Sequence, residues 1–295
     1  MSNIINIMKN CTLCPRQCRV DRTYGSGFCG GGDTVRVAKI MTHPWEEPCI
    51  CGEGGAGAVF FSGCALGCVY CQNRDISRGE CGEEYTADAL SELFTRIANS
   101  GVSCLDLVTP SHYAPQIDVA LAGANIPVPV VYNVGGYERA DTVRRYMSRA
   151  DVFLADFKYG TAETAAKYSS APDYTETAVS ALRAMYDTVG DPVYGDDGIL
   201  QKGVILRHLV LPGERRDSVK ALQLAASAVP PENVILSLMR QYTPGFAPRE
   251  FKNLCRRVTT FEYDYVRDAA IEMGYSGYSQ DKDSATAAYT PDFRK

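Results

Sequence analysis

The residues best suited to chemistry are three cysteines, Cys64, Cys68 and Cys71, which follow the short apolar run 58–63. A short loop that leads into a helix can turn three sulfurs with this spacing toward one point. An iron–sulfur cubane usually takes four protein thiolates, so three thiolates would leave one iron with an open coordination position. Open positions on a bound metal are where metal sites do chemistry. The alternative is three buried or zinc-binding cysteines that have this spacing by chance.

A second group of cysteines lies near the N-terminus, at Cys11, Cys14, Cys18 and Cys29. Four soft ligands within one compact segment are enough to close a metal site completely, and the turn at 25–27 contains two glycines that let the chain double back. Tetrahedral zinc and an auxiliary iron–sulfur cluster both fit four thiolates. The spacing does not decide between zinc, a cluster and free thiols.

Composition narrows the class of protein. The chain has 295 residues, 45% hydrophobic and 22% charged, which is typical of a soluble globular protein with one large domain and an appendage. A net charge of −5 argues against a general nucleic-acid-binding face. The sequence shows neither a membrane-spanning stretch nor the features of a signal peptide, so we expect a cytoplasmic protein.

The cysteine count agrees with this expectation. Twelve cysteines in a chain without an export signal indicate metal ligands rather than disulfides. Five of them lie outside the two groups, and Cys49 and Cys51 receive no role. Cys104 and Cys255 stand in apolar segments, so we expect both to pack in the core.

Short apolar runs alternate with amphipathic stretches from about residue 57 onward. Thr86 predicts the start of a helix over 87–99, and helices are also predicted over 173–189, 218–228 and 248–273. The last stretch, 276–295, is polar, and we expect a mobile tail or a flap. The predicted strands cover 57–62, 103–109, 128–133, 151–157, 203–210 and 233–239.

Six strands that alternate with helices predict parallel βα units, which wind right-handedly. The expected fold is α/β, a partial six-stranded (β/α) barrel with a cysteine-rich N-terminal extension, and the second choice is a doubly wound open sheet. In both folds functional residues lie after the carboxyl ends of strands, where the 64–71 cysteines stand. The predicted segments are a metal-binding segment at 1–52, a barrel at 53–245 and a C-terminal helix with its tail at 246–295.

Three blocks of sequence carry a family resemblance. The cluster-loop string 68–77, the Asp156-Phe-Lys158 triplet and the Arg207-His-Leu-Val-Leu-Pro-Gly213 block resemble the glycyl-radical-enzyme activases, relatives of pyruvate formate-lyase activating enzyme in the radical S-adenosylmethionine (SAM) superfamily. An uncharacterised branch of activase relatives is more similar still. Its blocks correspond to Cys11–Cys18, Trp45–Cys49 and Val108–Tyr113.

The resemblance implies a radical SAM enzyme. An external one-electron donor such as flavodoxin or ferredoxin would reduce the cluster, SAM would split into methionine and a 5′-deoxyadenosyl radical, and that radical would take a hydrogen atom from the substrate. Activation of a glycyl-radical enzyme, modification of another protein and modification of a small molecule all remain open. The competing class is a non-catalytic electron-transfer or zinc-binding module.

The resemblance also implies roles for single residues. Cys64, Cys68 and Cys71 would hold a [4Fe–4S] cluster whose open iron binds the amino and carboxylate groups of SAM. Asp156 could help to hold a monovalent cation, and Lys158 would neutralise carboxylate charge. For Tyr70 the alternatives are a place near the adenine and simple packing, and for His208 a place near SAM and a structural role. The further cofactor-binding candidates are Asn73 and Asn133.

One departure from the superfamily pattern affects the SAM pocket. Most radical SAM enzymes carry Gly-Gly-Glu after the second strand, where it binds the SAM amino group. Here that position reads Thr109-Pro-Ser-His112, and Thr109, Ser111 or His112 would have to replace the missing hydrogen bonds. The only similar string, Gly135-Gly-Tyr-Glu138, follows the third strand and is predicted to be a turn.

Overall fold

The computed structural model describes residues 7–79 and 81–280. One sheet runs through this part of the chain, and a short strand, β7 (Val193–Tyr194), pairs with its β8. In spatial order the strands of the sheet are β10 (Ser276–Ser279), β9 (Ile235–Met239), β8 (Leu200–Leu209), β6 (Val152–Asp156), β5 (Val130–Val134), β4 (Cys104–Val108), β2 (Ala56–Phe61), β1 (Val35–His43) and β3 (Glu83–Tyr85).

The direction and order of the strands decide the fold class. From β2 to β10 each strand pairs in parallel with the next one along the sheet, whereas β1 is antiparallel to β2 and to β3. Among the parallel strands the order never reverses, as it would at the switch point of a doubly wound sheet. The sheet does not close on itself, so the predicted partial barrel is confirmed, and all six predicted strands are present.

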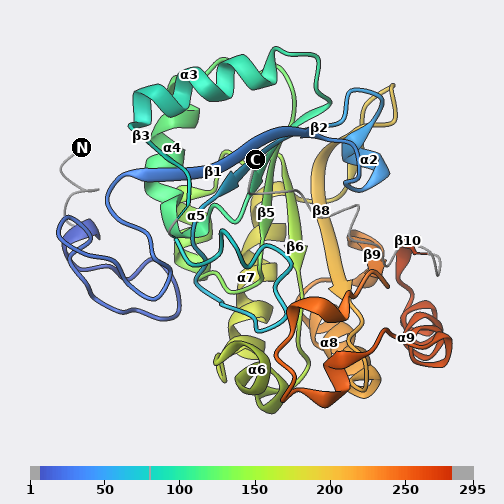
Figure 1. The fold of residues 1–295 in the computed structure, drawn as a ribbon. Coiled ribbons are helices and arrows are strands. Elements are labelled where there is room, and N and C mark those ends of the chain that lie inside the picture. The colour runs from blue at the N-terminus through green and yellow to red at the C-terminus, as the bar shows by residue number, and fades with distance from the viewer. Residues whose placement is uncertain (1–6, 80, 281–295) are drawn as a thin grey trace.

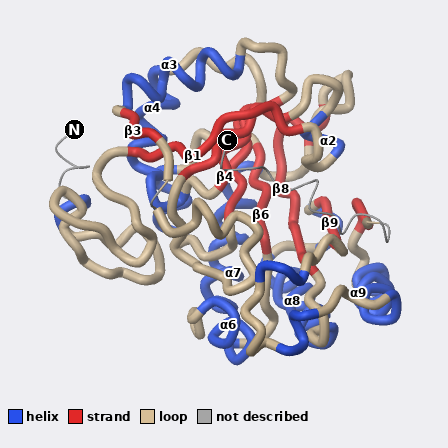
Figure 2. Tube along the Cα trace, viewed as in Figure 1, coloured by secondary structure: helices blue, strands red, loops and turns tan. Residues whose placement is uncertain are grey.

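Helices follow most of the parallel strands and cover one face of the sheet (Figures 1 and 2). In α3 the Thr86 side chain accepts the Ala89 N–H, and the apolar stripe that includes Leu90 and Phe94 is buried, as the sequence predicts. The helices are α3 (Ala87–Ala98), α4 (Ala114–Gly123), α5 (Ala140–Tyr146), α6 (Ala162–Ser169), α7 (Tyr174–Val189), α8 (Arg215–Ala228) and α9 (Thr260–Glu272).

The opposite, inner face is closed at one end by the short helix α2 (Pro48–Cys51). Cys49 and Ile50 pack there against Ala56, Cys104 and other residues at the amino ends of the strands. The core position predicted for Cys104 is confirmed, but the one for Cys255 is wrong, because Cys255 is exposed. It lies in a short 3₁₀ turn, Lys252–Cys255, outside the sheet and its helices.

Strand β1 is an element that the sequence did not predict. It lies inside the segment 1–52, yet it pairs with β2 along most of its length. A register shift between Val37 and Lys39 interrupts the alternation of inward and outward side chains. The period of two that marks a strand is therefore lost halfway along it.

Two expectations for the C-terminal region need correction. The last helix begins at Thr260 rather than Pro248, because a capping box between Thr259 and Glu262 fixes its start. Residues 276–279 are not part of a tail but form β10, parallel to β9. The remainder of the expected tail, 281–295, lies outside the described residues. No helix in the described ranges is long and apolar enough to span a membrane.

Candidate cofactor site

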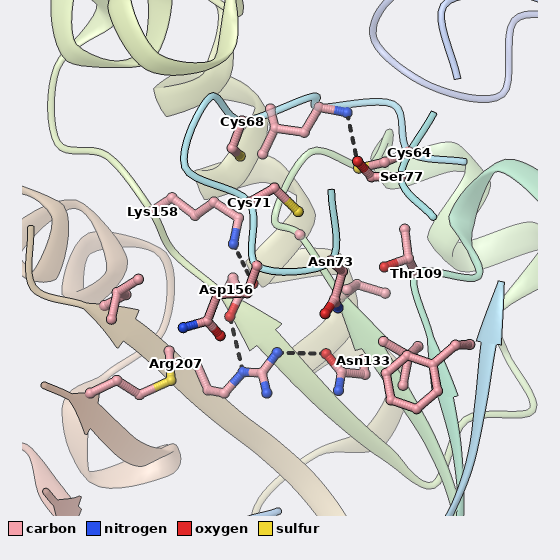
Figure 3. Close-up of a pocket in the computed structure, with 18 of the residues that line it drawn as sticks. Cys64, Cys68, Cys71, Asn73, Ser77, Thr109, Asn133, Asp156, Lys158 and Arg207 are labelled. Carbon is pink, nitrogen blue, oxygen red and sulfur yellow. Dashed lines mark hydrogen bonds and ion pairs between the residues drawn. The ribbon is translucent and has the colours of Figure 1, made fainter. Parts of the chain in front are cut away.

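A cavity of about 450 Å³ opens at the carboxyl ends of the parallel strands. Most of the loops after the parallel strands supply part of its wall, and β8 contributes Arg207 and Leu209 from within the strand. Side chains from the loops after β2, β4 and β6 surround the same space in Figure 3, together with Asn133 of β5 and Arg207 of β8. The residues contributed directly after strands include Cys64 after β2, Thr109 after β4, Gly135 after β5, Lys158 after β6 and Gln241 after β9.

All three cysteines of the loop after β2 line this cavity. The Leu66 N–H donates to the Cys64 sulfur over 3.4 Å, and the Ser169 hydroxyl donates to the Cys68 sulfur over 3.1 Å. Burial, together with the neighbouring thiols of Cys68 and Cys64, raises the pKa of Cys71 to about 12. Such thiols stay protonated until a metal displaces the protons.

These residues fit an iron–sulfur cluster with one open position. Soft sulfur ligands from one loop face a shared cavity, and N–H and O–H groups donate to two of the sulfurs. Within residues 7–79 and 81–280, no group of three or more His, Cys, Asp or Glu side chains could hold a metal ion as arranged. In a cubane each thiolate binds its own iron, so the three sulfurs need not meet at one ion.

Gly63 joins the cluster loop to the N-terminal segment. A Cβ at this position would lie 2.2 Å from the carbonyl oxygen of Cys29, and the backbone φ of +98° also favours glycine. The next amide, Cys64 N–H, donates to the same Cys29 oxygen over 3.1 Å. The two groups of cysteines are therefore in backbone contact.

The four N-terminal cysteines are neighbours in the structure. Burial, together with the nearby Cys29, Cys11 and Cys18, raises the pKa of Cys14 to about 12. Cys18 is exposed and the other three are buried. All twelve cysteines are free, as expected for reduced thiols. Nothing in this arrangement separates zinc from a cluster, and the N-terminal metal centre stays a prediction.

A charged network stands across the cavity from the cysteines (Figure 3). Lys158 Nζ and Arg207 Nε both donate to Asp156, the latter over 2.9 Å, and Arg207 Nη2 donates to Asn133 Oδ1 over 2.5 Å. Burial alone would raise the pKa of Asp156, but Arg207 and Lys158 outweigh burial and lower it. The carboxylate is therefore charged, and so is Lys158, because burial lowers its pKa but Asp156 and Cys68 together outweigh burial and raise it.

His208 does not join this network. Its neighbours Arg207 and Leu209 line the cavity, whereas the buried His208 is not among the lining residues, and its Nδ1 bonds the Phe157 carbonyl over 2.6 Å. The expected place of His208 near the cofactor therefore needs correction, because successive side chains of a strand point to opposite faces. Arg207, which the sequence analysis left without a role, occupies that place. The alternation along 203–210 could have identified it.

The Thr-Pro-Ser-His loop lies in the cavity wall with backbone strain. Thr109, Ser111 and His112 all line the cavity, and Thr109 has a φ of +60°, which a β-branched residue rarely adopts. Its N–H donates to the Asn133 carbonyl over 2.9 Å. His112 Nε2 bonds the Ser62 carbonyl over 2.8 Å, and burial lowers the pKa of His112 to about 3, so the ring is neutral.

Glu138 is a site residue that the sequence analysis missed. The segment 135–138 was expected to be only a turn, but the Glu138 side chain is buried and lines the cavity. Ser111 Oγ donates to its Oε1 over 2.8 Å, whereas the buried Oε2 has no hydrogen-bond partner among the residues that the structure describes. Burial raises the pKa of Glu138 to about 7. The similarity of this string to Gly-Gly-Glu was the signal that could have identified it.

The two remaining candidates also line the cavity. Tyr70 is nearly buried, its hydroxyl donates to the Tyr159 hydroxyl over 3.0 Å, and its ring packs edge-on against Tyr168 and Tyr242. It therefore both packs and faces the cavity. The Asn73 carbonyl accepts the N–H groups of Ile76 and Ser77, which closes the turn after Cys71.

Comparison with known proteins adds an independent finding. Residues 50–111 match a family model described as a 4Fe-4S single cluster domain. This segment is similar to an iron–sulfur domain. It contains the three cysteines of the cavity and the Thr-Pro-Ser part of the loop after β4. The match therefore supports an iron–sulfur cluster at the cysteine loop after β2.

Longer matches include one to a curated protein and one to a solved structure. An uncharacterized protein of Methanocaldococcus jannaschii is 25% identical over 275 residues, which cover 90% of this chain and 75% of that protein. The crystal structure of methylornithine synthase aligns with a TM-score of 0.44 at 14% identity, over 71% of this chain. The alignment spans 60% of the methylornithine synthase chain.

Proposed function

We propose that this protein is a radical SAM enzyme. The observation that carries the proposal is that three cysteines from one loop line a cavity at the carboxyl ends of a parallel partial barrel, and that no fourth cysteine among the described residues lines it. The similarity of residues 50–111 to a 4Fe-4S single cluster domain supports the cluster, and the sequence blocks of the activases support SAM.

When bound, the cluster would supply one electron to SAM, and SAM would supply a 5′-deoxyadenosyl radical that takes a hydrogen atom from the substrate. Cys64, Cys68 and Cys71 would hold the cluster. Lys158 offers an ammonium to the SAM carboxylate. Glu138 offers the free Oε2 as an acceptor for the SAM amino group, in place of the missing Gly-Gly-Glu.

The surrounding residues would position SAM and exclude water. Tyr70 offers an aromatic surface to the adenine. Thr109, Ser111, Asn73 and Asn133 offer polar groups around the rest of the molecule, and Asp156 holds Lys158 and Arg207 in place. The electron would come from a protein such as flavodoxin or ferredoxin. Activation of a glycyl-radical enzyme is one candidate reaction, based on the sequence blocks alone.

The test is SAM cleavage by anaerobically reconstituted protein with a chemical reductant. Wild type should form 5′-deoxyadenosine and methionine, and Cys68→Ala should lose the iron of this site and all cleavage. Cys255→Ala is the matched control, because Cys255 is exposed and outside the cavity. Full cleavage by Cys68→Ala would overturn the assignment. A wild type that binds iron but never cleaves SAM would favour a non-catalytic electron-transfer module.

A further inference from the structure

The inner end of the cavity is acidic. Glu46 and Glu47 follow β1, line the cavity and lie next to α2, which closes the amino end of the inner face. Asp106 stands on β4 two residues before Val108, which also lines the cavity, so both side chains point to the same face. We call Glu46, Glu47 and Asp106 the acidic floor.

Carboxyl groups outnumber the cationic side chains near the acidic floor, and they hold one another partly protonated: burial, followed by Asp106 and Glu47, raises the pKa of Glu46 well above its usual range, and burial raises the pKa of Asp106 to about 7. In the part of the chain that the structure describes, the carboxylates that line the cavity are Glu46, Glu47, Glu138 and Asp156, and the permanently cationic side chains are Lys158 and Arg207. Lys158 bonds Asp156, and Arg207 is shared between Asp156 at 2.9 Å and Glu46 at 3.5 Å. Asp106 adds a further carboxylate behind the wall.

Several polar atoms of this region have no hydrogen-bond partner within the described residues. They belong to side chains at least nine-tenths buried: Glu47 Oε2, both carboxylate oxygens of Asp106 and His43 Nδ1. Glu47 and His43 line the cavity, but these two atoms are buried beneath its surface, so a ligand would reach them after a side-chain rotation. Burial, followed by Arg207, lowers the pKa of His43, so the ring is neutral and its free nitrogen can accept a hydrogen bond.

Apolar side chains stand beside the acidic floor. Phe60, Val108, Leu209 and Met239 line the same cavity. Buried acceptor atoms without hydrogen-bond partners destabilise the protein, and a bound donor group removes this cost. A ligand that contacts both the acidic floor and the apolar side chains would therefore carry a cationic donor group on an apolar chain. A bare ion would satisfy the acceptors but leave the apolar wall without contacts.

We propose that the acidic floor binds the ammonium group of a small aliphatic amine, and that this amine is the substrate class of the site. The ammonium would donate to Glu47 Oε2 and to the other free acceptors of the floor, and its carbon chain would pack against the apolar wall. The substrate assignment rests on the radical SAM function proposed above. The binding itself does not.

The test measures binding rather than turnover. Anaerobically reconstituted protein saturated with SAM is dialysed to equilibrium against radiolabelled n-butylamine, with 1-butanol as the neutral analogue and Mg²⁺ as a competitor. We expect n-butylamine to bind at least tenfold more tightly than 1-butanol, because a hydrogen bond to a charged group is worth a factor of about ten to a hundred. Glu47→Gln should reduce amine binding at least tenfold.

Matched variants show whether a loss of amine binding comes from misfolding. Glu53→Gln makes the same change at an exposed carboxylate six residues away and should leave binding unchanged. If Glu47→Gln loses iron or SAM binding, amine binding is measured instead with Asp106→Asn, which changes a carboxylate of the floor on β4. Equal binding of amine and alcohol, displacement of the amine by SAM, preferential binding of Mg²⁺, or unchanged affinity in both floor variants would overturn the proposal.

The two proposals can fail separately. Absence of 5′-deoxyadenosine in wild type would overturn the radical SAM function and the substrate assignment with it, while selective amine binding would still establish the site. Normal SAM cleavage without amine selectivity would overturn the amine proposal alone.

Discussion

Lys158 offers the sharpest test of a single residue in the site. Its ammonium is fixed by Asp156, which keeps a second partner in Arg207 when Lys158 is removed. Lys158→Ala should therefore weaken SAM binding while the fold and the cluster remain. One charge-assisted hydrogen bond to a partly buried carboxylate is worth about 1.5–3 kcal/mol, or about tenfold to a hundredfold in affinity.

Isothermal titration of SAM into anaerobic protein, with iron content measured in parallel, checks this prediction. Lys220→Ala, an exposed lysine on α8, is the control and should bind SAM like wild type. Unchanged SAM affinity in Lys158→Ala would remove Lys158 from the SAM site. A parallel loss of iron would make it a residue needed for folding.

Arg16 shows how one side chain supports the cluster loop from outside. It stands between Cys14 and Cys18 and donates to the carbonyls of Ala65 and Leu66, just after Cys64. It also donates to the carbonyls of Ser169 and Ser170, and the Ser169 hydroxyl bonds the Cys68 sulfur. Arg16 therefore fixes the backbone around two cluster ligands without touching the cavity.

Arg16→Gln should loosen the cluster loop, because a glutamine has two N–H donors where arginine has five. We expect the variant to bind a cluster but to lose it faster in air, by a factor of about ten for each 1.4 kcal/mol of support removed. Loss of the cluster's visible absorption over time measures this. Arg19→Gln changes an exposed arginine of the same segment and should match wild type. Equal rates in both variants would contradict the prediction.

At the scale of elements, α9 depends on one buried carboxylate. Glu262 accepts hydrogen bonds from Thr259 N–H over 3.0 Å, from Gly213 N–H over 2.7 Å and from Arg256 Nη2 over 2.7 Å. The hydrogen bond from Arg256 is the main cause that lowers the pKa of Glu262, against the effect of burial. One side chain thus joins the start of α9 to the loop after β8.

Because the pKa of Glu262 is lower in the folded protein, its charged form stabilises the fold. This contribution is complete above the ordinary glutamate pKa of about 4.3 and is lost as the pH falls toward the folded value. Glu262→Gln should therefore be less stable than wild type at pH 7, and the difference should shrink below about pH 4. Urea unfolding at several pH values, with equal metal content, measures this. Glu250→Gln, at an exposed position, should show no such trend.

At the scale of the whole molecule, the two cysteine groups should load metal separately. The triple variant of Cys64, Cys68 and Cys71 to alanine should still contain about four irons or about one zinc, held by Cys11, Cys14, Cys18 and Cys29. Metal analysis of the purified protein decides between the two metals. A triple variant that contains neither would make the N-terminal segment purely structural.

The sequence predicted those parts of the fold and site that depend on local pattern. The parallel strands have continuous apolar runs, Thr86 is a strong helix cap, and the 64–71 cysteines follow a strand end, so all were visible. Features that depend on partners far along the chain were not predicted. The bulge in β1 hides its alternation, β10 exists because β9 offers an edge, and Glu138 lies in the cavity wall bonded to Ser111 from the loop after another strand.

The contact between Gly63, Cys64 and the Cys29 carbonyl has a consequence for how the protein can be divided. A chain cut at residue 53 would keep the six predicted strands and the three cluster cysteines. It would also leave the Cys64 amide without its acceptor and remove Arg16 from the loop. The N-terminal segment is thus part of the cluster site. A chimaera that takes its barrel from a relative would have to take the N-terminal segment of the same relative as well.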